Sequence, residues 1–117
     1  MNDRTVARGI GVTTALSGLG LLLAPETSLR AMGAPTTSPA PLLYRVIGMF
    51  MTVAGGVLTD GTTTPVVLRW AVAQKVGAVG GVALGVAGGQ YRRAALGVAG
   101  FDALSALLLA RMSRRTP

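Results

Sequence analysis

The sequence predicts an all-α integral membrane protein, a single-domain (1–117) bundle of four transmembrane helices with little chain outside the bilayer. Half of its 117 residues are apolar, only 13% are charged, and the mean hydropathy is +0.57. Soluble domains carry about 25% charged residues, and so short a chain has a large surface to cover in water. Four apolar stretches each approach the roughly 20 residues that cross a bilayer. Lipid is therefore the solvent that this composition suits.

The four predicted spans are bounded by residues that begin or end helices. Pro25 ends the first span, and Thr64 followed by Pro65 is a favourable N-cap and first residue for the third. The spans are Val6–Ala24, Leu42–Thr59, Val66–Gly88 and Ala94–Met112.

The connections differ in length. Residues 25–41 contain four prolines, so they cannot form one continuous helix. Their first part, Pro25–Met32, is expected to form a short interfacial helix that ends at Gly33. The other connections, residues 60–65 and 89–93, are short, which favours antiparallel neighbours.

The first span resembles a secretory signal peptide in having Arg4 and Arg8 before an apolar run. No small-x-small cleavage motif follows it, so a transmembrane helix is favoured. Six of the ten arginines lie on the side of the termini (Arg4, Arg8, Arg69, Arg111, Arg114, Arg115). Because cytoplasmic loops are enriched in basic residues, we expect a plasma-membrane protein with both termini in the cytoplasm.

The composition excludes several chemistries. The chain has no Cys and no His, which removes disulfides, thiol nucleophiles, imidazole bases and the usual zinc or haem ligands. No phosphate-binding glycine motif follows a strand, so neither a metal nor a cofactor is expected. The net charge of +7 is spread over the ends of the apolar runs. That distribution predicts contact with membrane lipids and no nucleic-acid binding.

Glycines recur every four residues in the third span, at Gly77, Gly81, Gly85 and Gly89. Residues four apart share a helix face, and glycine lets a neighbouring helix approach closely. Packing within the chain is favoured; the alternatives are a homo-oligomer contact and a groove for a lipid-like ligand. Similar small faces occur in the first span (Gly11, Thr14, Ala15, Gly18) and the fourth (Ala95, Ala99, Ala103).

Two ionisable residues lie inside predicted spans. At about 1.5 Å per residue, Asp102 lies roughly 12 Å below one membrane face and Lys75 roughly 16 Å below the same face. The two are therefore expected at matching depth in antiparallel helices. On a structural interpretation, Lys75 and Asp102 form an ion pair. Otherwise Lys75 extends to the interface while Asp102 forms a hydrogen bond with the backbone or with Ser105. The alternative is a proton-handling acid, because burial disfavours the charged carboxylate.

The other charges are expected near the membrane faces. Arg45 shares a face with Glu26 and Arg30, which suggests a Glu26–Arg45 pair, whereas Asp60 and Arg69 share the opposite face. Interfacial pairs are usually structural. The functional alternatives are a catalytic carboxyl at Glu26 or Asp60, and an anionic headgroup or a diphosphate bound by Arg45 or Arg30.

The five aromatic residues divide by depth. Tyr44, Trp70 and Tyr91 fall near the interfaces, as an anchoring belt would. Phe50 and Phe101 lie near mid-depth, where they pack against the bundle or lipid or face a ligand.

The chain resembles the small four-helix DoxX-like membrane proteins of bacteria, and its composition resembles that of actinobacterial chains. The resemblance rests on the four spans, the segment 25–33, Arg45-x-x-Gly48, Lys75, and Gly100-Phe101-Asp102-Ala103-Leu104. Among such proteins are small membrane-bound terpene cyclases of indole-sesquiterpenoid and drimane-type pathways. The resemblance implies acid-initiated carbocation cyclisation of a prenylated, farnesyl-type isoprenoid in a dry pocket.

On this interpretation the candidates for the catalytic acid are the carboxyl groups of Asp102, Asp60 and Glu26. The substrate is bound by Lys75, Arg45, Phe50, Phe101, Trp70 and Tyr44. Two other functions stay open. One is a non-catalytic accessory or structural membrane protein. The other is a small proton-coupled transporter, although the small multidrug exporters carry their essential acid in the first helix and Val6–Ala24 has none.

Overall fold

A computed structural model of the chain describes residues 2–115, and every regular element among them is helical. The elements are α1 (Asp3–Leu23), α2 (Pro25–Met32), α3 (Ala40–Asp60), α4 (Pro65–Ala87), a 3₁₀ turn η1 (Arg93–Ala95) and α5 (Leu96–Arg115). The four-helix fold class is confirmed. The four long helices are long and apolar enough to cross a membrane, which suggests a multi-pass membrane protein.

The helix boundaries follow local chemistry. α1 begins earlier than expected because the Asn2 side chain accepts a hydrogen bond of 2.8 Å from the backbone N–H of Thr5. Pro65 is the first residue of α4, as predicted, but the Thr64 side chain makes no capping hydrogen bond. α5 continues past Met112 to Arg115, where basic side chains favour a helix C-terminus.

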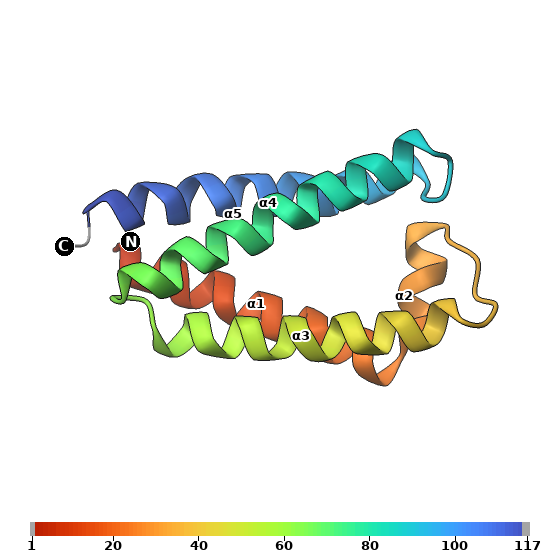
Figure 1. Cartoon of the computed structure of the whole chain (residues 1–117), viewed down its shortest axis with the longest axis horizontal. Helices are drawn as coiled ribbons and strands as arrows, with labels where there is room; N and C mark the ends of the chain where they lie inside the picture. The colour runs from red at the N-terminus through yellow and green to blue at the C-terminus, as the bar shows by residue number, and fades with distance from the viewer. Residues whose placement is uncertain (1, 116–117) are drawn as a thin grey trace.

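The long helices form two antiparallel pairs, α1 with α3 and α4 with α5 (Figure 1). α4 diverges from α3 after their short connection, so these consecutive helices meet over only part of their length. The chain termini lie at the same end of the bundle (Figure 1). A small apolar core joins the two pairs and consists of Ala7, Ile10, Leu58, Leu68, Leu109 and Met112.

α1 and α3 pack with their backbones in close contact. A Cβ placed on Gly18 would lie 2.6 Å from the carbonyl oxygen of Gly48, and one on Gly55 would lie 2.5 Å from that of Gly11. Only glycine fits at such distances. The small face predicted on the first span is therefore a tight packing face, and its partners, Gly48 and Gly55 of α3, were not predicted as packing residues.

The expectation that the glycine stripe of the third span packs within the chain is wrong for most of its length. A Cβ on Gly77 or Gly81 would meet nothing within 4 Å. Gly85 is covered by the ring of Tyr91, and Gly89 occupies a left-handed turn with φ +73°. The reason is the direction of burial, because α4 buries the side that carries Leu68 and Lys75, and Gly77 and Gly81 lie on the other side of the helix. Contact with a second copy through the open glycines stays a prediction.

α2 lies at the end of the bundle opposite the termini (Figure 1). The predicted short helix is confirmed, with Leu29 buried and Gly33 ending it at φ 74°. The backbone N–H of Arg92 donates to the carbonyl of Met32 at 2.9 Å, and the Arg92 side chain packs on Gly33. These contacts tie α2 to the turn between α4 and α5.

Candidate functional site

The centre of the bundle holds a buried polar cluster built from three helices. Lys75 Nζ on α4 lies 3.1 Å from Asp102 Oδ1 on α5 and donates a hydrogen bond of 2.6 Å to Thr14 Oγ1 on α1. Lys75, Asp102 and Thr14 are only 2%, 7% and 3% exposed. The matching depth predicted for Lys75 and Asp102 is confirmed as direct contact. Sequence reasoning missed Thr14 as the third partner, although it had placed Thr14 on the small face of the first span.

This arrangement neutralises the lysine within the interior. An isolated buried ammonium is very costly, and a paired one is tolerated when its remaining protons find acceptors. Nζ also lies 5.4 Å from the centroid of the Phe101 ring, close enough for a cation–π interaction. An ammonium has three protons. Thr14 and Asp102 accept two of them, and no residue within 2–115 accepts the third.

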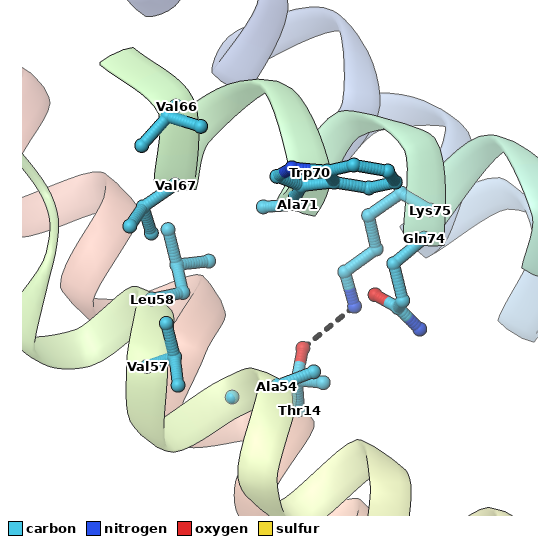
Figure 2. Close-up of a pocket in the computed structure, with 11 residues that line it drawn as sticks. Thr14, Ala54, Val57, Leu58, Val66, Val67, Trp70, Ala71, Gln74 and Lys75 are labelled. Atoms are coloured by element: carbon cyan, nitrogen blue, oxygen red, sulfur yellow. Dashed lines mark hydrogen bonds between the residues drawn. The ribbon is translucent and has the colours of Figure 1, made fainter. Parts of the chain in front are cut away.

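An apolar pocket of about 290 Å³ adjoins the cluster, between α3 and α4 with one residue of α1 (Figure 2). Figure 2 shows the Lys75 side chain extending to Thr14 with Gln74 beside it. The lining residues are Thr14, Ala54, Gly55, Val57, Leu58, Val66, Val67, Trp70, Ala71, Gln74 and Lys75. Nothing in the sequence pattern indicated this pocket, because it depends on the divergence of α3 and α4.

The mouth of the pocket faces the outside of the bundle between α3 and α4. Val57 on α3 and Val66 and Trp70 on α4 line the pocket, yet their side chains are largely exposed, with Trp70 at 73%. These exposed parts are apolar, and they lie on helices apolar enough to be surrounded by lipid. The pocket therefore opens on an apolar outer surface of the bundle.

The three carboxyl groups predicted as catalytic lie apart. Asp102 is buried in the cluster, whereas Asp60 is exposed at the end of α3 and Glu26 is exposed on α2, 3.5 Å from Arg30. Within residues 2–115, no three carboxylates gather closely enough to hold a metal ion. Of these three carboxyl groups, that of Asp102 belongs to the buried polar cluster inside the bundle.

The expected Glu26–Arg45 pair is wrong. Glu26 pairs with Arg30, one turn along its own helix. Arg45 Nη1 instead donates a hydrogen bond of 2.7 Å to the carbonyl oxygen of Leu22. The last four carbonyls of a helix lack partners within it, so the Arg45 side chain satisfies one of those in α1.

The aromatic residues named as substrate-binding are not gathered at one site. Trp70 lines the pocket and Phe101 contacts Lys75, whereas Phe50 is exposed and does not line the pocket. The Tyr44 hydroxyl donates a hydrogen bond of 2.7 Å to the Tyr91 hydroxyl. This bond, which sequence reasoning missed, links α3 to the turn after α4.

Comparison of the chain with known protein families, curated proteins and solved structures gives no match. The DoxX-like resemblance therefore stays a prediction from the sequence. The buried cluster and its pocket carry the functional argument.

Proposed function

We propose that this protein binds a neutral, elongated apolar molecule of the isoprenoid class within the bilayer, with one oxygen atom of the ligand held by Lys75. The observation that carries the proposal is the apolar pocket between α3 and α4, into which the partly satisfied ammonium of Lys75 projects. Ligand pockets are typically apolar and contain a few placed polar groups. This pocket fits that description.

The charge of the cluster favours a neutral ligand. Asp102 already balances Lys75, so a phosphate or carboxylate entering the pocket would bring an unbalanced charge into a dry environment. A carbonyl, ether or epoxide oxygen needs only a hydrogen bond. The third N–H of Lys75 is the donor available for it.

The size and mouth of the pocket favour a chain-like ligand. A volume of about 290 Å³ accommodates only part of a long prenyl chain. The rest would lie along the exposed apolar side chains of Val57, Val66 and Trp70 and continue into lipid.

Photo-crosslinking tests the proposal. The probe is a prenyl ketone bearing a diazirine, compared with the prenyl phosphate of equal length, on purified protein in lipid nanodiscs. We expect the ketone to label peptides of α3 and α4 and the phosphate to label them weakly. Ala54→Phe fills the pocket without removing a polar group, and it should abolish labelling. Leu104→Phe changes an exposed position that does not line the pocket, and it is the matched control.

Two results would overturn this proposal. One is equal labelling of the wild type and Ala54→Phe. The other is stronger labelling by the phosphate than by the ketone.

A second candidate, acid-initiated cyclisation of a prenylated substrate, is favoured by Asp102 and Phe101. Asp102 is a buried acid, and the adjacent Phe101 ring already faces a cation, as a ring that stabilises a carbocation would. The activity requires an acid that reaches the substrate, whereas Asp102 is engaged by Lys75 at 3.1 Å and is not among the residues that line the pocket. For this reason binding is the primary proposal.

Acid variants test the second candidate. Asp102→Asn, Asp60→Asn and Glu26→Gln are assayed in membranes with farnesylated indole substrates. Loss of turnover confined to Asp102→Asn would support it, and full turnover in all three variants would refute it.

We also infer a plasma-membrane location with both termini in the cytoplasm. The support is the shared end of the termini together with the six arginines assigned to that side. Because the chain has no cysteine, a single Ser113→Cys variant can be tested with an impermeant thiol reagent. Labelling in intact cells would contradict this orientation.

A further inference from the structure

α1 carries a stripe that changes from basic to apolar along one outer face. Arg4, Arg8, Val12 and Leu16 follow one another at intervals of four residues, so they share a face. All four are exposed, although α1 buries its opposite side against α3. The basic part lies at the end of the bundle where the chain termini lie (Figure 1).

The basic part of this stripe borders a shallow groove of about 670 Å³. Its lining residues are Asn2, Arg4, Thr5, Arg8, Gly9, Val12 and Thr13. The space around Gly9 is open, since a Cβ there would meet nothing within 4 Å. The groove therefore combines two guanidinium groups, two hydroxyl groups and an apolar edge.

The two arginines are available to an external anion. Neither Arg4 nor Arg8 forms an ion pair with any residue in 2–115, and the neighbouring Asp3 lies 3.5 Å from Arg115 instead. Arg8 Nε donates a long hydrogen bond of 3.4 Å to the carbonyl of Thr59, which leaves its terminal nitrogens unpartnered within that range. Side chains one turn apart lie about 5–6 Å from each other at Cβ. Two guanidinium groups at that spacing can bind one phosphate together.

We propose that this stripe binds an anionic phospholipid, with its phosphate between Arg4 and Arg8 and an acyl chain along Val12 and Leu16. Charge complementarity selects the anionic headgroup, and the apolar continuation of the same helix face selects a lipid over a soluble polyanion. The site lies on the outer face of α1, separate from the pocket between α3 and α4. It therefore stands independently of the proposed isoprenoid site.

Native mass spectrometry of the full chain tests the proposal, with phosphatidylglycerol and phosphatidylcholine as probes. Each arginine near a membrane surface contributes about 1 kcal/mol, so Arg4→Gln/Arg8→Gln should weaken phosphatidylglycerol binding by about tenfold to thirtyfold. Arg111→Gln/Arg114→Gln removes the same charge from the same end of the bundle and should weaken binding less than about threefold. Phosphatidylcholine should bind weakly to every variant.

Gly9→Phe provides a second variant that keeps both arginines and fills the groove. Phosphatidylglycerol binding should also be lost in Gly9→Phe. This variant keeps the proposal testable if the double arginine variant fails to fold. Equal losses in the two double variants would show attraction to net charge alone and overturn the site. Unchanged binding in Gly9→Phe, or equal binding of the two lipids by the wild type, would overturn it as well.

Discussion

Replacing Lys75 by Met should be among the most destabilising single substitutions in this bundle. The side chains are similar in length, so packing changes little, but the variant leaves the Asp102 carboxylate without its partner at 3.1 Å. Asp102 is 7% exposed, so water cannot take the place of the ammonium. Thr14 also loses its donor, but it can still donate to a carbonyl of the preceding turn.

The magnitude follows from the burial of the pair. Removing one partner of a buried ion pair costs about 3–5 kcal/mol of unfolding free energy. Replacing both partners by apolar residues of similar size is often neutral or stabilising, so Lys75→Met/Asp102→Leu should lie within about 1 kcal/mol of the wild type or above it. The two substitutions should therefore be strongly non-additive.

Unfolding in mixed micelles by titration with dodecyl sulfate measures these free energies. Trp70 is the single tryptophan of the chain and lines the pocket that contains Lys75, so its fluorescence reports on this region, and far-ultraviolet circular dichroism reports on helix content. Glu26→Gln provides the control. It breaks a pair whose side chains are more than half exposed, and exposed pairs contribute about 0–1 kcal/mol.

Two outcomes would refute the reasoning. A loss below about 1 kcal/mol in Lys75→Met would mean that the pair is solvated or not formed. A double variant whose loss equals the sum of the two single losses would mean that Lys75 and Asp102 do not interact.

Three further predictions use the same unfolding assay or the labelling assay. Gly48→Ala should lower the unfolding free energy by about 1–3 kcal/mol, because its Cβ would overlap the α1 backbone. Gly81→Ala places its Cβ in open space and should be neutral or slightly stabilising. Equal effects of the two substitutions would contradict the packing of α1 on α3. Tyr44→Phe should cost about 0.5–1.5 kcal/mol by removing the hydroxyl bond to Tyr91, and adding Tyr91→Phe should cost little more, so additive losses would argue against that bond. Glu26→Gln should leave isoprenoid labelling unchanged, since Glu26 on α2 is not among the residues that line the pocket; a loss of labelling would place the ligand elsewhere.

The shared level of Lys75 and Asp102 along the bundle could be predicted from the sequence, because a helix rises by a fixed distance per residue. The direction in which a side chain points around the helix decided the other contacts. Arg45 contacts the carbonyl of Leu22 rather than Glu26, and Thr14 completes the lysine cluster.

The glycine pattern shows the same division. Small residues every four positions predict that a helix can be approached closely, and both α1 and α4 have such a face. The chain uses the face of α1, against Gly48 and Gly55, and leaves Gly77 and Gly81 open. Local spacing does not select between faces, because the choice depends on which helix lies opposite.

The sequence by itself determined the four apolar helices, their approximate limits, the short α2 and the shared level of Lys75 and Asp102, because hydropathy, proline and helical rise act within a segment. Only the tertiary structure decided that the helices pair as α1 with α3 and α4 with α5, and that α3 and α4 diverge to form an apolar pocket beside Lys75. Those features depend on how helix faces fit one another across the bundle. That fit is a property of several segments at once, which no single segment encodes.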